Sequence, residues 1–138
     1  IDNNCAYCVE GDLVAKFGIK ICELETSKVY LFKEQSHPGR CIVAHKKHVG
    51  DMNELTAEER AAYFEDVARV ARAIMKAFNP DKVNYGAYGD TGHHLHFHLC
   101  PKYKDEYEWG GVFLMNPDKK YLTDAEYAEM IEKIKANL

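Results

Sequence analysis

Three histidines alternate with apolar residues between His94 and Leu99, and this pattern constrains the fold more than any other feature of the chain. Successive side chains of a β-strand point to opposite faces, so His94, His96 and His98 would share one face while the apolar residues between them face a core. These alternate positions hold three of the seven histidines in the chain, and His93 adjoins them. We therefore expect a half-buried strand whose polar face is a functional site rather than an ordinary surface.

An imidazole on such a face can do one of two things near neutral pH. It can ligate a metal ion as the neutral base, or it can act as a nucleophile or acid and base, because its ordinary pKa of about 6.5 lies close to the working pH. The spacing alone does not separate these roles.

The residues around the histidines resemble the motifs of the histidine triad (HIT) family. The stretch from His94 to Cys100 is similar to the family motif His-φ-His-φ-His-φ-φ, where φ is apolar. The Pro-Lys-Tyr that follows it resembles the sequence that follows the motif in many bacterial members. Residues 39–48, Gly-Arg-Cys-Ile-Val-Ala-His-Lys-Lys-His, resemble the family stretch Gly-His-x-Leu-Val-Ile-Pro-Lys-x-His. Asn84 and the Gly-Asp-Thr of residues 89–91 resemble two family loops, so the resemblance runs from about Cys5 to Tyr103.

Local patterns predict the elements of an α+β fold. Apolar and β-branched runs at 11–22 and 27–33 suit a hairpin, and residues 41–44, 82–88 and 93–100 suit further strands. Capping boxes from Thr56 to Glu59 and from Thr123 to Glu126 predict a long helix that ends at Asn79-Pro80 and a C-terminal helix over 123–138. Residues 104–122 are the irregular stretch. The resemblance implies an antiparallel HIT-like sheet of about five strands with one long and one C-terminal helix, in a single HIT domain over 1–138.

The cysteine pattern predicts thiols and metal ligands rather than a disulfide framework, because five cysteines are an odd number in a His-rich chain. Cys5 and Cys8 have the two-residue spacing that can place both sulfurs on one tetrahedral ion, whereas the other three lie in apolar runs and suit core packing. Some bacterial HIT proteins complete such a zinc site with two histidines. The resemblance therefore implies a structural zinc held by Cys5, Cys8, His48 and His94, with residues 1–10 as the zinc-binding segment and no organic cofactor.

The resemblance also implies the chemistry. In HIT enzymes the middle histidine, here His96, attacks the α-phosphorus of a purine nucleotide and forms a nucleotidyl-imidazole that water hydrolyses. The third, His98, would contact phosphate as a second catalytic residue, and its identity as His rather than Gln favours hydrolysis over transfer. Asn84, Gly89 and Thr91 would bind the substrate with His98. The expected substrates are dinucleoside polyphosphates or nucleoside phosphoramidates, and the sequence does not choose between them.

Several residues depart from the family pattern on the substrate side. Asp90 replaces a common Gln, and His45 stands where the family has Pro. No residue of the stretch 32–36 matches in register the Asp or Asn that accepts the ribose hydroxyls, although Glu34 or Gln35 could substitute chemically. Trp109, in the irregular segment, could contact the substrate or pack on the domain as an apolar anchor.

Two other functions remain open. The chain could be a zinc-stapled nucleotide-binding or interaction module with little turnover, because fold resemblance does not establish activity. The triad could instead hold a catalytic zinc, but same-face neighbours on a strand are about 7 Å apart, which is too far for all three to meet one ion without distortion.

Composition limits the class of partner. With 138 residues and 46% hydrophobic residues the chain can bury one domain core, and its net charge of −4 argues against a protein that binds a nucleic-acid polymer. No run approaches the roughly 20 apolar residues of a membrane span. The first four residues lack the pattern of a signal peptide and the missing initiator Met suggests a trimmed start, so a cytoplasmic location is the default. The resemblance further implies a homodimer that uses a small nucleotide as substrate.

Overall fold

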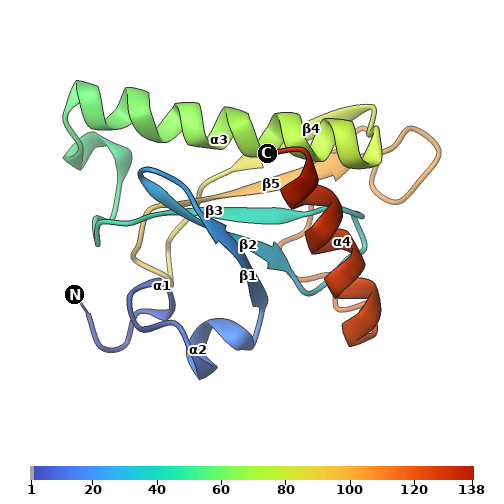
Figure 1. Cartoon of the computed structure of the whole chain (residues 1–138), viewed down its shortest axis with the longest axis horizontal. Coiled ribbons are helices and arrows are strands. Elements are labelled where there is room, and N and C mark those ends of the chain that lie inside the picture. Colours follow the sequence, from blue (N-terminus) through green and yellow to red (C-terminus); the bar gives the residue numbers. More distant parts are fainter. Residues whose placement is uncertain (1) are drawn as a thin grey trace.

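The computed structural model describes residues 2–138, and Ile1, the first residue of the predicted domain and zinc-binding segment, lies outside them. Its centre is a five-stranded antiparallel sheet in the order β1-β2-β3-β5-β4 (Figure 1). The strands are β1 (Gly18–Glu23), β2 (Ser27–Phe32), β3 (Cys41–His45), β4 (Lys82–Gly86) and β5 (His96–Lys102). The single-domain organisation stays a prediction.

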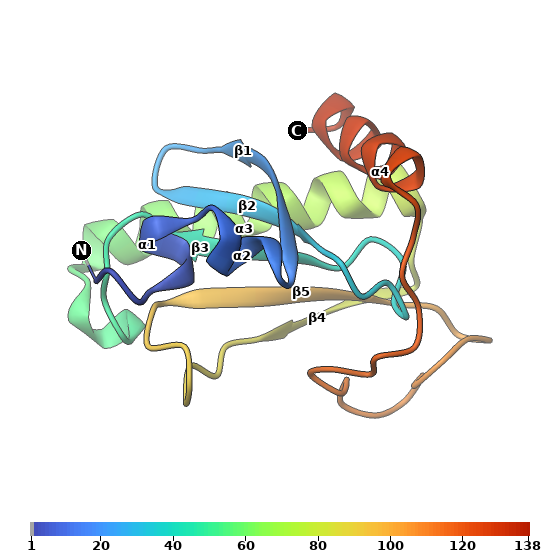
Figure 2. The same ribbon diagram turned by 90° about the horizontal axis from the view of Figure 1, so that it is seen from below.

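Helices cover both faces of the sheet. The long α3 (Ala57–Phe78) and the C-terminal α4 (Asp124–Ala136) pack on one face, and the short α1 (Ala6–Val9) and α2 (Asp12–Ala15) lie on the other (Figures 1 and 2). A 3-10 turn, η1 (Met52–Glu54), precedes α3. The α+β class and the antiparallel sheet of five strands with a long and a C-terminal helix are confirmed. None of the helices within residues 2–138 has the length and apolar character that crossing a bilayer requires.

The alternation of each strand divides the core into two clusters. On β2, Val29 and Leu31 belong to the cluster under α3 and α4, whereas Tyr30 and Phe32 belong to the cluster under α1 and α2. On β5, Phe97 and Leu99 join the first cluster, so His96 and His98, which alternate with them, face the α1 side. The predicted separation of histidine and apolar faces is confirmed.

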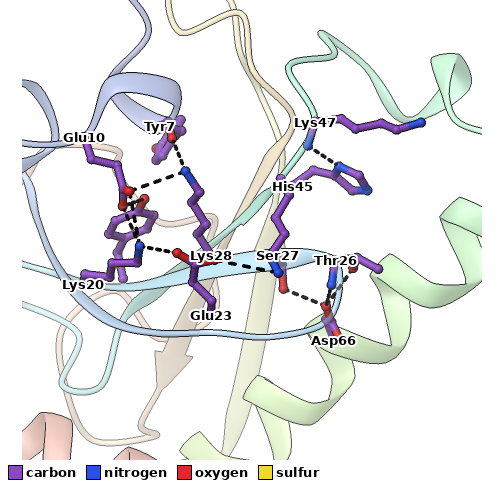
Figure 3. A network of polar contacts seen from close by, with 12 residues as sticks. Tyr7, Glu10, Lys20, Glu23, Thr26, Ser27, Lys28, His45, Lys47 and Asp66 are labelled. Atoms are coloured by element: carbon purple, nitrogen blue, oxygen red, sulfur yellow. Dashed lines mark hydrogen bonds and ion pairs between the residues drawn. The ribbon is translucent and has the colours of Figure 1, made fainter. Parts of the chain in front are cut away.

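The long helix forms where the capping box predicts it. The Thr56 hydroxyl accepts from the Glu59 N–H, and the Glu59 carboxylate accepts from the Thr56 N–H. The helix ends at Phe78, and its C-cap residue Asn79 adopts a left-handed conformation at φ 51°. Within α3 the buried Asp66 carboxylate accepts from the backbone and hydroxyl of Thr26 and the hydroxyl of Ser27, which fixes α3 to the β1–β2 turn (Figure 3).

Three of the strands predicted from the sequence have wrong boundaries. The first strand does not include residues 11–17, which contain α2. A helical turn brings Val14 and Phe17, three residues apart, to the same apolar cluster, whereas a strand would point them to opposite faces. The predicted strand 82–88 ends at Gly86, and the predicted strand 93–100 begins only at His96 and runs to Lys102.

The late start of β5 has a local cause. The His45 N–H donates to the Leu95 carbonyl, but the Leu95 N–H donates to Val49 instead of returning a bond to His45. The His45 carbonyl is taken by the His94 ring, whose Nε2 lies 2.6 Å away. The ladder between β3 and β5 therefore begins at His96, three residues after the start of the predicted strand 93–100.

Candidate functional site

A cavity of about 810 Å³ lies on the sheet face that carries the histidines. All three triad histidines line it, together with Tyr7 from the N-terminal segment and Phe113 from the 104–122 segment. Its volume is in the range of cavities that bind small molecules, and its walls are largely apolar and aromatic with a few polar groups, as in many ligand sites.

Among residues 2–138, His96 has a hydrogen-bond partner for one ring nitrogen and none for the other. Its Nδ1 lies 2.6 Å from the His94 carbonyl oxygen. A carbonyl only accepts, so Nδ1 carries the proton and donates it, and Nε2 of the neutral ring keeps a lone pair. Burial lowers the pKa of His96, which favours this neutral form. The Tyr7 ring packs against the His96 ring with a centroid separation of 4.9 Å and limits its movement.

His98 lies next along the same face, with ring centroids 5.4 Å from His96. Burial, followed by the nearby charge of Arg40 and by His96, lowers the pKa of His98 to about 3. Its Nδ1 is 3.1 Å from Arg40 Nη2, and the Phe32 ring meets it edge-on at 5.5 Å. His98 is therefore a neutral, tightly packed imidazole at the cavity wall.

Four side chains converge beside the triad in a set that can hold a metal ion. The ligand atoms of Cys5, Cys8, His48 and His94 all lie within 4.8 Å of one another. Cys5 Sγ is 3.3 Å from His94 Nδ1, Cys8 Sγ is 3.3 Å from His48 Nδ1, and the two Nδ1 atoms are 3.1 Å apart. These are the four residues that the family resemblance implies as zinc ligands, and the structure brings them together.

The cluster fits a tetrahedral zinc by geometry and by chemistry. Zn–S and Zn–N bonds of about 2.3 and 2.0 Å place tetrahedral ligand atoms roughly 3.3–3.8 Å apart, close to the observed separations. The outer nitrogen of His94, Nε2, lies 2.6 Å from the His45 carbonyl, so its proton is donated there and Nδ1 is free to ligate. Burial is the main cause that lowers the pKa of His94 to about 4, which keeps the ring in the neutral form a ligand needs.

The N-terminal segment that carries both cysteines is fastened to the sheet. Lys28 on β2 donates to the Tyr7 carbonyl at 3.0 Å and approaches the Glu10 carboxylate (Figure 3). The Tyr30 hydroxyl donates to the same carboxylate at 2.7 Å. These bonds hold α1 over the triad, so the cysteines reach the two histidines without further movement of the chain.

The three triad histidines have three different partners. The His94 ring belongs to the four-residue cluster, the His96 ring is bonded to a carbonyl, and the His98 ring is bonded to Arg40. Within residues 2–138 the triad does not converge on one point as ligands of a single ion. The arrangement therefore does not favour the hypothesis of a catalytic three-histidine zinc.

Of the predicted substrate-binding residues, all except Asn84 line the cavity. Gly89 and Thr91 lie in the β4–β5 loop and line the cavity, together with Asp90. Gly89 has φ +82°, a conformation that favours glycine. Asn84 lies on β4 opposite Cys100, on the triad side of the sheet, but it is not part of the cavity lining.

Glu34 and Gln35, the two candidates for the ribose, are used inside the fold. The buried Glu34 carboxylate accepts from Ser36 and from the backbone N–H groups of Lys119 and Lys120. The Gln35 amide bonds to the backbone of residues 32, 39 and 40. Neither side chain lines the cavity.

Trp109 also lies outside the cavity lining and is 42% exposed. The 104–122 segment reaches the cavity through Val112, Phe113, Met115 and Asn116 instead. Phe113 packs at 6.3 Å from the His98 ring. The aromatic residue of this segment that lines the cavity is therefore Phe113 and not Trp109, the residue named from the sequence.

Sequence reasoning did not identify Tyr7, Phe32 or Arg40 as site residues. Tyr7 lies between the two cysteines of the predicted metal motif, and this position in the sequence is a signal that it lies near the site. Phe32 and Arg40 lie at the end of β2 and just before β3, on the alternate positions that face the triad. That signal can be read only once the strand pairing is known.

Comparisons with known proteins agree on one family. The family model described as "HIT domain" matches residues 18–105. Protein hit of Bacillus subtilis is 30% identical over 83% of this chain and 82% of its own length. Adenosine 5'-monophosphoramidase hnt1 of Schizosaccharomyces pombe is 29% identical over 78% and 80%. The bis(5'-adenosyl)-triphosphatase of Dictyostelium discoideum is 28% identical over 67% and 65%.

Solved structures share the fold. A histidine triad protein from Sinorhizobium meliloti superposes with a TM-score of 0.85 at 22% identity and covers 93% of this chain and 95% of its own. A zinc-bound histidine triad family protein from Mycobacterium smegmatis superposes with a TM-score of 0.67 at 21% identity, covering 96% and 93%.

Proposed function

Because this chain belongs to the HIT family, we propose that it is a nucleotidyl hydrolase that cleaves at the α-phosphate of a purine nucleotide. Relatives named as an adenosine monophosphoramidase and a bis(5'-adenosyl)-triphosphatase support two substrate classes, nucleoside phosphoramidates and dinucleoside polyphosphates. Both present an α-phosphate between an adenosine and a leaving group, so one site of this kind can serve either.

The observation that carries the proposal is the hydrogen bond between His96 Nδ1 and the His94 carbonyl, at 2.6 Å. It leaves the His96 Nε2 lone pair free on a ring that lines the cavity. In the proposed reaction Nε2 forms a bond to the α-phosphorus, and the bond to the leaving group breaks with its electron pair. Water then attacks the phosphorus, the bond between phosphorus and His96 Nε2 breaks with its electron pair returning to the ring, and the nucleotide leaves. The proton that water gives up balances the proton that the leaving group took.

The remaining residues have supporting roles in this proposal. His98 donates a hydrogen bond to a phosphate oxygen, the Thr91 hydroxyl and the loop at Gly89 bind the phosphate side, and Asn84 takes part from β4. The aromatic rings of Tyr7 and Phe113 line the same cavity and offer apolar faces to the base.

Cys5, Cys8, His48 and His94 are proposed to hold a structural zinc. When bound, the ion supplies four ligand bonds that join the N-terminal segment, the turn after β3 and the start of the triad. The residues themselves do the positioning: His94 ligates through its ring and holds the His96 ring through its carbonyl. A closed set of four protein ligands suits a structural role.

The test is the release of AMP from adenosine phosphoramidate and, separately, from diadenosine tetraphosphate. We expect wild type to hydrolyse at least one, and His96→Ala to lose hydrolysis by at least about 10³-fold while it still binds AMP and keeps its circular dichroism spectrum. If His96→Ala retained most of the activity, His96 would not be the nucleophile. Binding of AMP by a wild type that hydrolyses neither compound would support the binding-module function.

Two properties implied by the resemblance stay predictions. A homodimer is expected, and light scattering on the purified chain measures its mass directly. A cytoplasmic location is expected, and fractionation of the source cells tests it.

A further inference from the structure

Arg40 is a buried cation beneath the triad. It precedes β3 on the strand face that carries His98, and its exposed fraction is 0%. Its guanidinium carbon lies 4.0 Å from the centroid of the Phe32 ring and 4.9 Å from that of Phe113. The charge is therefore held between two aromatic faces, which attract cations.

The polar contacts of Arg40 do not include an acid. Nη2 lies 3.1 Å from His98 Nδ1 and 3.3 Å from Met115 Sδ, and Nη1 donates to the Leu114 carbonyl at 3.3 Å. Nε is buried and has no hydrogen-bond partner among residues 2–138. None of the ion pairs formed by residues 2–138 includes Arg40. A buried charge without a counter-ion is costly, so the fold keeps Arg40 in this position at an energetic penalty.

The contact with His98 has only one chemically consistent form. A guanidinium has donors and no acceptor, so His98 Nδ1 must accept and cannot carry a proton. A neutral imidazole then carries its proton on Nε2. We propose that Arg40 is a positioning residue that holds His98 as a neutral imidazole with its proton on Nε2.

This inference deepens the proposed function, on which it rests. With Nδ1 occupied, Nε2–H is the donor that His98 can offer to a phosphate oxygen, and the ring needs no reorganisation when the phosphate arrives. His96 and His98 would then have opposite tautomers on adjacent positions of one face. His96 presents a lone pair from Nε2, and His98 presents a hydrogen from Nε2.

The electrostatic surroundings of His98 agree with this form. Burial is the largest cause that lowers the pKa of His98 and so disfavours a second proton, and Arg40, just before β3, and His96 on β5 act in the same direction. Its other close ring neighbours are Phe32 from β2 and Phe113 from the 104–122 segment, which do not titrate. Removing the guanidinium should therefore make His98 easier to protonate.

The test is nitrogen NMR of the histidine side chains in substrate-free protein between pH 8 and pH 5. The His98 signals are assigned from the spectrum of His98→Gln. In wild type we expect Nδ1 unprotonated and Nε2 protonated throughout this range. In Arg40→Met we expect the Nδ1 signal to shift and His98 to begin to take up a second proton as the pH falls.

Lys102→Met is the matched control. Lys102 is also a buried cation, and it fastens the same segment by donating to the carbonyls of Glu108 and Gly111, at 2.8 and 2.6 Å. It makes no hydrogen bond to His98. We expect the His98 signals of this variant to match those of wild type, so a change shared by both variants would indicate loosening of the segment and would overturn the proposal.

Further results of these experiments also test the proposed role of Arg40. A wild-type spectrum with the proton on Nδ1 overturns the inference even if Arg40→Met does not fold, as does an Arg40→Met spectrum that matches wild type. Hydrolysis assays on the same samples separate the two proposals. A wild type with the expected tautomer and no hydrolysis contradicts the proposed function, and an active wild type with the proton on Nδ1 contradicts only the role of Arg40.

Discussion

His94 and His96 are joined by a hydrogen bond from the His96 ring to the His94 carbonyl, and the His94 ring belongs to the four-residue metal-type cluster. One residue thus connects the cluster with the ring that we propose as the nucleophile. The connection is short and passes through the backbone, so a change in the cluster should alter the position of the His96 ring.

Replacing both cysteines, Cys5→Ser with Cys8→Ser, should remove about one equivalent of zinc from the purified protein. A ligand present at 100 to 1,000 times its Kd adds about 3–4 kcal/mol to the free energy of unfolding. We therefore expect the thermal midpoint of the double variant to lie about 10 °C below that of wild type. Metal analysis and thermal unfolding measure both. Cys22→Ser, a half-buried cysteine outside the cluster, is the control and should keep its zinc. An unchanged metal content in the double variant would contradict the zinc site.

Phe113→Ala should weaken substrate binding, since it removes an aromatic wall of the cavity. An aromatic contact of this kind is worth about 1–2 kcal/mol, so we expect KM to rise about 5- to 30-fold. Trp109→Ala removes an aromatic residue of the same segment that does not line the cavity, and its KM should equal that of wild type. Steady-state kinetics on both variants measure this. A larger effect for Trp109 would mean that the tryptophan, and not Phe113, contacts the substrate.

Glu34 should make the protein sensitive to acid. Burial raises the pKa of its carboxyl, but hydrogen bonds from Ser36, Lys120 and Lys119 outweigh burial and lower the pKa below its ordinary value. A pKa that is lower in the folded state adds stability above the unfolded pKa of about 4.3, and this stability is lost as the pH falls through the folded pKa. We therefore expect Glu34→Gln to cost about 1–3 kcal/mol at pH 7 and less at pH 3.

Urea unfolding of wild type and Glu34→Gln at the two pH values measures that difference. Glu129→Gln, at an exposed position of α4, is the control and should show little change at either pH. A Glu34→Gln cost that is equal at pH 7 and pH 3 would show that the ionised carboxylate does not fasten residues 119–120 to the 34–36 turn.

The sequence is sufficient to predict those parts of the fold that depend on interactions between residues close together along the chain. The capping boxes at Thr56 and Thr123 predict where α3 and α4 begin, because both partners of each box lie within three residues. The alternation of β5 predicts the face shared by the histidines. The start of β5 was missed, since it depends on Val49 and His45, which are distant in sequence.

The candidate site divides in the same way. The four metal-type ligands could be predicted because the family resemblance pairs Cys5 and Cys8 with His48 and His94. Arg40 and Phe113 could not be identified, since their importance comes from contacts across the sheet and from a segment without regular structure. Chemistry carried by one strand is visible in the sequence, whereas the groups that orient it are visible only after folding.

The most direct test of the account is the mass of the intact protein after brief mixing with adenosine phosphoramidate or diadenosine tetraphosphate and rapid quenching. The account predicts that wild type gains the mass of one adenylyl group with at least one substrate and that His96→Ala, which keeps the fold, gains none. An adduct of equal yield on His96→Ala, or hydrolysis by wild type without any adduct on the millisecond scale, would contradict covalent catalysis by His96.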